Sequence, residues 1–454
     1  MQTIPSAVVG EAHEIELLEG ARALFPAMIF AIDAARIEVL VETYIFDTAG
    51  SAAEVAEALI RAAARGVACR LVIDGIGTGR VPAPWPERFE RAGVQLRVFA
   101  PLGRLGLLLP SRWRRMHRKL CVVDGVTAFC GGINILDDWL DPNWGRLEAP
   151  RLDFAVCVHG ELAAEIRRAM QKLWQRIEAM GDVRRSDLPK ALKSLRTDPP
   201  HADAVAKAQA SEQQRVGALP PPRERGEGGE RGERSERGEQ GDAAGHAPDH
   251  AAPAASIFKA DAVLLLRDNL RNRNRIERAY RKAIGGARHD IVIASAYFLP
   301  GRKLRRALVH AALRGVRVQL LLQGRYEYFL QFHGVRPVYH KLLAAGIEIH
   351  EYAPSFLHAK VAVIDAGGAR PWATVGSSNL DPLSLLLARE ANVAIEAGEF
   401  CEALRVRLHD AIEQEGRKVS AVDLANRPWH ERLLDRIAAG LMRVALVLAG
   451  AQRY

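Results

Sequence analysis

The chain has 454 residues, of which 48% are hydrophobic, and its formal net charge is +9 at pH 7. This length and apolar content exclude a small or wholly disordered protein and are sufficient for two domains with cores of their own. The positive charge favours polyanionic partners, either nucleic acid or an acidic membrane surface, and does not choose between them.

The N-terminal segment, MQTIPSAVVGEAHEIELLEG, lacks the basic start and apolar run of a secretory signal peptide. No window reaches the roughly 18 uninterrupted apolar residues of a spanning helix, so we expect contact with a membrane from one side only. The cysteines are Cys69, Cys121, Cys130, Cys157 and Cys401. They form no CxxC pair, and the first four lie in apolar runs, so we expect no disulfide framework, no zinc site and a reducing compartment.

The first half of the chain predicts a strand, a helix and a second strand in succession. Residues 37–47 read as a buried strand, residues 54–67 have helical spacing, and ACRLVIDGIG returns to a strand. Gly66 follows the helical pattern after an arginine, where a left-handed helix C-cap is needed.

Residues 102–119, LGRLGLLLPSRWRRMHRK, interleave leucines and a tryptophan with arginines. This composition is typical of an interfacial segment that inserts apolar groups and binds lipid phosphates. The alternative is a core strand followed by a basic exit loop.

A polar pattern within an apolar strand follows in residues 117–124, HRKLCVVD. His117 and Lys119 are two apart on a strand, so they point to the same face and offer an imidazole beside an ammonium. Asp124 completes the motif, and we expect its main role to be structural, as a turn residue. The following FCGGIN has glycines that let the backbone approach a ligand, and Asn134 supplies an amide for phosphate oxygens.

Residues 196–257 are rich in Pro, Gly, Arg, Glu and Ala, with almost no large apolar side chains. Such a segment cannot bury enough surface to offset the entropy of ordering it, so we expect a disordered linker. Its alternating Arg and Glu disfavour an RNA-binding role. The linker separates one half, residues 1–195, from a second, residues 258–425, which a terminal segment, 426–454, follows.

The second half repeats the first: residues 290–300 read as a strand, residues 303–316 as a helix capped by Gly315, and RVQLLLQGR as a strand. AARGVACRLVIDG matches AALRGVRVQLLLQG. A duplicated strand–helix–strand unit gives parallel strands, so each half should be an α/β layer with helices outside.

The second half also repeats the polar motif as HAKVAVID (358–365), followed by TVGSSN after a connector four residues longer. The candidate residues here are His358, Lys360, Asp365, Ser377, Ser378 and Asn379. A lone histidine on a strand is usually a packing residue of the core. A lysine on a strand usually prevents edge-to-edge pairing with another chain, and the asparagines could be turn residues. Duplication of the whole set outweighs these interpretations.

Two histidines, two lysines and amide donors around one point suit phosphodiester chemistry. One histidine would attack phosphorus, and the other would protonate the leaving alkoxide and then deprotonate the incoming hydroxyl. The lysines would stabilise the non-bridging oxygens, so no metal and no cofactor is expected. Carboxylates that fix the histidine tautomers are expected at Asp153 and Glu390.

The paired HxKxxxxD motifs, with GSSN after the second, resemble the phospholipase D superfamily. MHRKLCVVDGVTAFCGGIN, LLQGRYEYF, FLHAKVAVID and ATVGSSNLDPLSLLLARE are similar to bacterial cardiolipin synthases, in particular the B type without N-terminal membrane spans. The resemblance covers most of residues 13–195 and 258–454. It departs in the charged linker and in GGIN for GSxN, although GGxN is itself typical of this branch.

The resemblance implies two homologous phospholipase D-like α/β sandwich halves packed around one shared active site. It also implies a cardiolipin synthase that transfers a phosphatidyl group to phosphatidylglycerol through a phosphohistidine, at the cytoplasmic face of the inner membrane. We therefore expect an anionic phospholipid membrane as partner and no nucleic acid. The alternatives are a phospholipase D-type hydrolase or nuclease, and a non-enzymatic membrane-binding scaffold.

The C-terminal segment, residues 426–454, has apolar residues at helical spacing flanked by arginines. Only nine uncharged residues follow Arg443 before the next arginine, too few to span a membrane. The pattern predicts an amphipathic helix, either in a membrane interface or docked on the protein.

Overall fold

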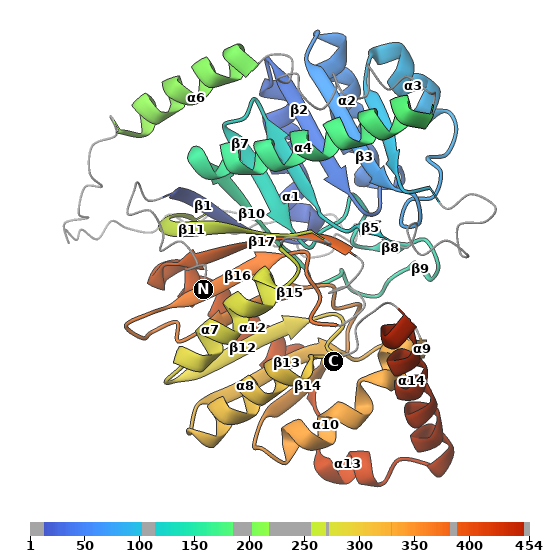
Figure 1. Ribbon diagram of the computed structural model, residues 1–454, viewed down its shortest axis with the longest axis vertical. Helices are drawn as coiled ribbons and strands as arrows, with labels where there is room; N and C mark the ends of the chain where they lie inside the picture. The colour runs from blue at the N-terminus through green and yellow to red at the C-terminus, as the bar shows by residue number, and fades with distance from the viewer. Residues whose placement is uncertain are drawn as a thin grey trace, which may run out of the picture.

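The computed structural model describes residues 13–101, 114–184, 202–217, 256–268, 272–327, 329–381 and 388–448. Two α/β halves lie one above the other, with the N-terminal half in blue to green and the C-terminal half in yellow to red (Figure 1). The fold predicted from the duplicated motifs is confirmed: the same order of strands and helices occurs twice.

The N-terminal half is a mixed sheet with parallel pairs at one end and antiparallel pairs at the other. Its strands, in spatial order, are β4 (Gln95–Phe99), β3 (Ala68–Asp74), β2 (Glu38–Thr43), β6 (Leu120–Val123), β7 (Thr127–Gly131), β10 (Phe154–His159) and β1 (His13–Glu19). Its helices are α1 (Gly20–Ala34), α2 (Ala52–Ala64), α3 (Trp85–Ala92) and α4 (Glu161–Arg184).

The C-terminal half repeats this order and adds one edge strand. Its strands are β18 (Gly416–Lys418), β14 (Glu348–Tyr352), β13 (Arg317–Gln323), β12 (Asp290–Ser295), β15 (Lys360–Ile364), β16 (Trp372–Gly376), β17 (Ala388–Glu396) and β11 (Ile257–Arg267). Its helices are α7 (Arg275–Gly286), α8 (Arg302–Leu313), α9 (Phe329–Gly334), α10 (Arg336–Leu343), α12 (Gly398–Glu415), α13 (Ala421–Ala425) and α14 (Trp429–Leu448).

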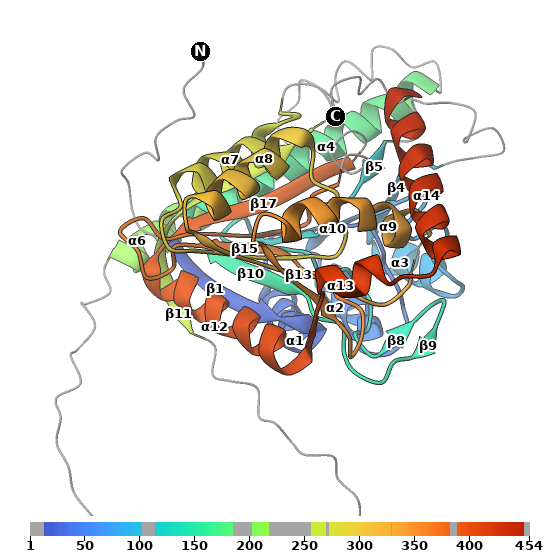
Figure 2. The same ribbon diagram turned by 90° about the horizontal axis from the view of Figure 1, so that it is seen from below.

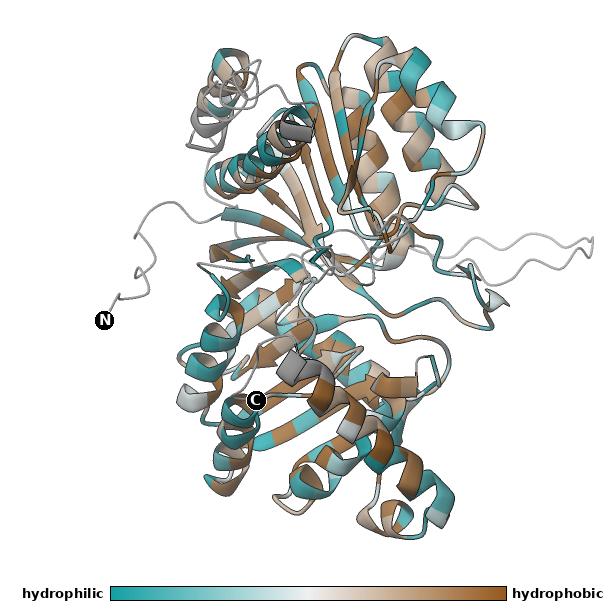
Figure 3. Cartoon of the chain, turned by 45° about the vertical axis from the view of Figure 1, so that its right-hand side comes forward, coloured by the Kyte–Doolittle hydropathy of each residue, from teal (hydrophilic) through white to brown (hydrophobic). Residues whose placement is uncertain are grey.

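The two sheets join edge to edge, because β1 pairs antiparallel with β11. A central core contains inner-face residues of both sheets together with residues of α4 and α12. Two outer cores lie under α1, α2 and α3 and under α7, α8 and α10. Apolar residues are concentrated in the strands and on the helix faces that cover them (Figure 3).

Both predicted strand–helix–strand units are present: β2 and β3 are parallel across α2, and β12 and β13 are parallel across α8. Gly66 and Gly315 each follow their helix with φ of +88°, a left-handed conformation that costs glycine little. The predicted longer second hairpin is also present, since β15 and β16 are further apart in the chain than β6 and β7.

The prediction of a disordered linker is wrong for residues 202–217, which form helix α6 (Ala202–Gly217). The sequence there, ADAVAKAQASEQQRVG, is rich in strong helix formers, which composition-based reasoning overlooked. Val205 is fully buried, and Nε2 of Gln209 donates to the carbonyl of Gly125 at 2.9 Å. The helix is thus docked on the turn after the first motif, and residues 218–255 lie outside the described part of the chain.

Helix α14 packs on α9 at one side of the C-terminal half. Nδ1 of His333 lies 2.7 Å from Oδ1 of Asp435, and Ala438 and Met442 are buried in the same contact. The small hairpin of β8 (Leu140–Asp141) and β9 (Gly145–Arg146) lies on the same side of the molecule as α14 in both views (Figures 1 and 2). In the described residues, no helix combines the length and apolarity that crossing a membrane requires.

Candidate active site

Each motif histidine contacts a carboxylate from the opposite half of the chain. Nδ1 of His117, just before β6, lies 3.1 Å from Oε2 of Glu390 on β17. Nδ1 of His358, just before β15, lies 2.6 Å from Oδ2 of Asp153, just before β10. A carboxylate only accepts hydrogen bonds, so each pair favours a proton on Nδ1 and leaves Nε2 to react. The sequence predicted these carboxylates but not their exchange between halves.

Main-chain hydrogen bonds repeat this exchange. The N–H of His117 donates to the carbonyl of Arg389 at 3.0 Å, and the N–H of His358 donates to that of Leu152 at 2.9 Å. The short strand β5 (Arg115–Met116) also pairs in parallel with the start of β17. Each motif is therefore held by the other half as well as by its own sheet.

The two motif lysines are buried beside the histidines. Nζ of Lys119 donates to the carbonyl of His117 at 3.0 Å, and Nζ of Lys360 donates to that of His358. Burial and the positive charge of Lys360 lower the pKa of Lys119 well below its ordinary value. Burial also lowers the pKa of Lys360 to about 8, against the effect of Asp153. An anion that binds beside the two lysines relieves the repulsion between their positive charges, so the pair makes a site for an anion.

The histidines lie in the same electrostatic environment. Burial lowers the pKa of His117, although Glu390 raises it. Burial and the charge of Lys360 lower the pKa of His358 well below its ordinary value. Burial raises the pKa of Asp153 to about 7. These shifts favour the neutral imidazole, the form that attacks phosphorus. A histidine that acts as the acid must first bind a proton, which the negative charge of a bound phosphate favours.

The GGIN and GSSN sequences accommodate different carboxylates. A Cβ on Gly132 would lie 2.7 Å from Oδ2 of Asp153, so only glycine leaves room for this carboxylate. At the equivalent position, the hydroxyl of Ser377 donates to Oε2 of Glu390 at 2.6 Å. Ser377, which was predicted to bind phosphate, thus holds the carboxylate of Glu390 in place. The first half has glycine at this position because the shorter side chain of Asp153 brings its carboxylate too close for a serine.

The remaining predicted donors are buried at the ends of the same hairpins. Oδ1 of Asn134 accepts from the N–H of Ile45 at 3.1 Å, so its NH₂ group is the part that can donate to a phosphate. The N–H of Ser378 donates to Oδ1 of Asn392 at 3.2 Å. Asn379 is buried, and its Oδ1 has no hydrogen-bond partner among the described residues.

Asp124 and Asp365 lie at the far ends of β6 and β15, about 16 Å of strand away from the lysines. Each has a φ of +50°. Each carboxylate accepts three main-chain N–H groups at 2.8–3.1 Å, from residues 36–38 in the first half and 288–290 in the second. Both therefore hold the start of the neighbouring strand and do not reach the histidines.

Sequence reasoning missed an aromatic and two buried ion pairs beside the first motif. The ring of Tyr44 lies 4.9 Å from that of His117. The one sequence signal for Tyr44 is its place directly after β2, because ligand sites often form at the carboxyl ends of strands in α/β sheets. Two further side chains from this region form buried ion pairs, Arg118 with Glu42 at 3.7 Å and Arg115 with Asp74 at 3.1 Å. The leucine-rich segment predicted to meet lipid, within 102–119, lies mostly outside the described residues.

A family model described as "Cardiolipin synthase, PLD-like domain" matches residues 28–174 and 280–411, one segment in each half. The chain belongs to this family. It is 31% identical to cardiolipin synthase B of Escherichia coli K12, over 97% of this chain and 90% of that protein. It is 25% identical to cardiolipin synthase A of Shigella boydii, over 94% of this chain and 74% of that protein.

Among solved structures, phosphatidylserine synthase of Haemophilus influenzae matches with a TM-score of 0.57 at 13% identity, over 97% of this chain and 95% of that one. This likeness shows a shared fold. The nearly full-length match to the synthases and the match to the family model support a phosphatidyltransferase enzyme of the phospholipase D superfamily.

Proposed function

We propose that the protein is a cardiolipin synthase that transfers a phosphatidyl group to phosphatidylglycerol through a phosphohistidine. The observation that carries this proposal is the exchange of carboxylates, Asp153 to His358 and Glu390 to His117. Histidines bound across the interface between the halves belong to one reaction centre, and a double displacement at phosphorus needs both.

In the first step, Nε2 of one histidine attacks the phosphorus of a phosphatidylglycerol donor. The P–O bond to glycerol breaks, and the other histidine protonates the leaving alkoxide. In the second step, the acceptor hydroxyl gives its proton to that histidine, its oxygen bonds to phosphorus and the P–N bond breaks. The sum is two phosphatidylglycerol molecules to one cardiolipin and one glycerol.

The lysines and amides stabilise the charge that develops on phosphorus. Lys119 and Lys360 act on the non-bridging oxygens, together with Asn134 and Asn379. Their burial strengthens each interaction, because water does not screen it. Tyr44 lies against both His117 and Lys119, and so limits where the ring and the ammonium can move.

We propose further that α14 binds the protein to the cytoplasmic face of an anionic membrane. Its outer side carries an apolar stripe of exposed side chains: Leu433, Ile437, Leu441 and Val444. Arg432 and Arg436 are exposed beside the stripe. The acidic Glu431 and Asp435 bind Arg427 instead, at 2.7 and 3.0 Å. The outer face is thus apolar and basic, as an acidic lipid interface requires.

The test is product analysis with vesicles of phosphatidylglycerol, by mass spectrometry over time. We expect mainly cardiolipin and glycerol, with phosphatidic acid a minor product. Excess glycerol should reverse the reaction, because the phosphohistidine conserves the phosphodiester energy. Phosphatidic acid that dominates from the earliest times, with no effect of glycerol, would identify a hydrolase, and cleavage of single-stranded DNA without lipid turnover would identify a nuclease.

A further inference from the structure

The two sides of the reaction centre differ at one position. Thr43 and Ser295 end equivalent strands, and each hydroxyl donates to the carbonyl two residues later. The residue that follows is Tyr44 in the first half and Ala296 in the second. The ring of Tyr44 lies against His117, whereas Ala296 has no ring to place beside His358.

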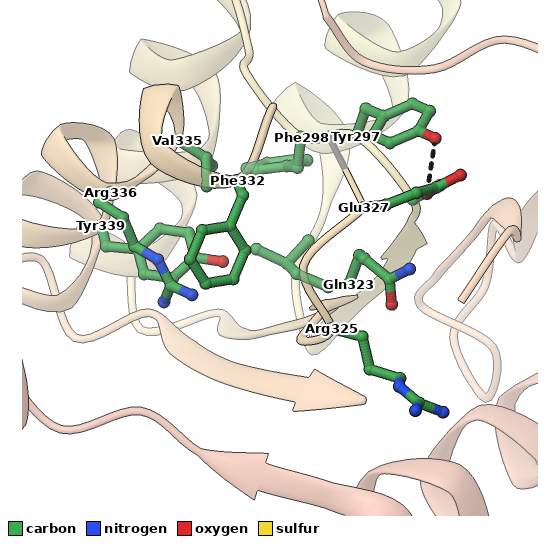
Figure 4. Close-up of a pocket in the computed structure, with 11 residues that line it drawn as sticks. Tyr297, Phe298, Gln323, Arg325, Glu327, Phe332, Val335, Arg336 and Tyr339 are labelled. Carbon is green, nitrogen blue, oxygen red and sulfur yellow. Dashed lines mark hydrogen bonds between the residues drawn. The ribbon is translucent and has the colours of Figure 1, made fainter. Parts of the chain in front are cut away.

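Ala296 is one of the residues that line a pocket open to solvent, whose other lining residues are shown in Figure 4. The N–H of Ala296 donates to the carbonyl of Ala359, next to His358, at 3.0 Å. Another lining residue, Gln323, accepts through Oε1 from the N–H of Leu357 at 3.1 Å. The pocket therefore adjoins the second HxK motif.

The polar end of the pocket has both an acceptor and a donor. Glu327 accepts from the hydroxyl of Tyr297 at 2.8 Å and keeps further lone pairs for a ligand (Figure 4). Nε2 of Gln323 is buried and has no hydrogen-bond partner among the described residues. The charge of Lys360 acts on Glu327, which places this carboxylate within electrostatic reach of the reaction centre.

Two arginines also line the pocket, but Arg336 is paired with Glu351, and Arg325 donates to the carbonyl of Pro354 at 3.3 Å. The polar atoms of Glu327 and Gln323 suit a hydroxyl better than a phosphate. A carboxylate repels a phosphate group but accepts hydrogen bonds from hydroxyls, and a hydroxyl can also accept from the amide of Gln323. Phe298, Phe332 and Val335 add apolar surface to the lining, and the guanidinium of Arg336 lies over the ring of Phe332.

We propose that this pocket binds the glycerol headgroup of the acceptor lipid, with Glu327 and Gln323 holding one hydroxyl while the other faces phosphorus. The held diol then reacts as described above: its free oxygen bonds to phosphorus, the P–N bond to histidine breaks and the proton passes to the other histidine. This inference rests on the proposed function and adds to it the site of acceptor choice.

The test uses the reverse reaction of the full-length protein on cardiolipin vesicles, with equal concentrations of glycerol and 1-propanol competing in one tube. 1-Propanol has the same carbon chain but lacks the two further hydroxyls. The ratio of phosphatidylglycerol made with glycerol to phosphatidylpropanol measures recognition of the diol. In the wild type, glycerol should be preferred, because a site that hydrogen-bonds a hydroxyl rejects an analogue without it.

Glu327→Gln should lower this ratio by about tenfold, the effect of losing a hydrogen bond to a charged group. Tyr297→Phe should lower it by a smaller factor. Glu165→Gln is the matched control, because Glu165 is a partly buried carboxylate on α4 outside the pocket, and it should keep the wild-type ratio.

A ratio that is unchanged in both pocket variants, or a parallel loss of both products at a constant ratio, would overturn the inference. Because both alcohols compete in the same sample, a partly unfolded variant does not change the ratio. If the wild type makes no transfer product with either alcohol, the proposed function fails and this inference fails with it.

Discussion

Asp153, from the N-terminal half, lies 2.6 Å from Nδ1 of His358, in the C-terminal half. In the converse pair, Oε2 of Glu390, from the C-terminal half, lies 3.1 Å from Nδ1 of His117, in the N-terminal half. Neither half can therefore orient its own histidine. Separate catalysis in each half would require a carboxylate from the same half at each ring.

Gly132 provides a test of the first of these pairs. A methyl group there would lie 2.8 Å from Cγ of Asp153, so Gly132→Ala should displace the carboxylate from His358. We expect at least a tenfold loss of kcat in a vesicle assay, since the imidazole loses its fixed tautomer. Gly285→Ala, where a Cβ meets nothing within 4 Å, is the control and should keep full activity. Equal activity in the two variants would show that the position of Asp153 is unimportant.

The pH dependence should show the titration of Lys360. Its pKa is lowered to about 8, and only the protonated ammonium stabilises phosphate oxygens. The pKa of Lys119 is lowered too, so the two lysines lose their protons as a coupled pair, and activity should be lost by the time the pH has risen through about 8. The profile of kcat/KM reports the free enzyme, so we expect its alkaline limb near pH 8. A profile that stays flat up to about pH 10 would show that Lys360 keeps its ordinary pKa.

The motif aspartates should affect stability more than chemistry. Asp124→Ala removes the acceptor of three main-chain N–H groups and places alanine at a φ of +50°. We expect a loss of roughly 2–4 kcal/mol in the free energy of unfolding, measured with urea. Asp410→Asn, at an exposed ion pair, should cost less than about 1 kcal/mol. If Asp124→Ala is as stable as wild type but inactive, Asp124 acts in catalysis instead.

The α14 stripe should control membrane binding. Replacing Ile437 and Leu441 by glutamate puts two charges on a face that we propose lies in the lipid interface. Co-sedimentation with phosphatidylglycerol vesicles should weaken at least tenfold, because apolar burial and attraction to the acidic surface are both lost. Val406→Glu, at a residue of α12 that is 46% exposed, is the control and should bind as wild type does. Unchanged binding of the double variant would assign membrane contact to another surface.

Much of the fold followed from local sequence patterns. Local patterns predicted the strands and helices, the caps at Gly66 and Gly315 and the two HxK spacings, because each of these depends on residues close together in the chain. Helix α6 was missed because the prediction relied on the composition of residues 196–257 as a whole, in which the helix formers of these sixteen residues did not stand out.

The arrangement of the site depended on contacts that no local pattern encodes. Which half supplies Asp153 or Glu390 to which histidine is decided by how the sheets pair through β1 and β11. The role of Ser377 likewise depends on Glu390, thirteen residues away on the next strand. The contrast of Tyr44 with Ala296 rests on the equivalence of β2 and β12, which occupy matching places in the two sheets.

The most direct test of a single shared centre is the turnover of His117→Ala and His358→Ala, each measured with phosphatidylglycerol vesicles. Because each histidine is needed in every catalytic cycle, the rate of each variant should fall by a factor of about 10² or more. A rate near half of the wild-type value in either variant would mean that the two halves work independently, and would contradict the shared centre.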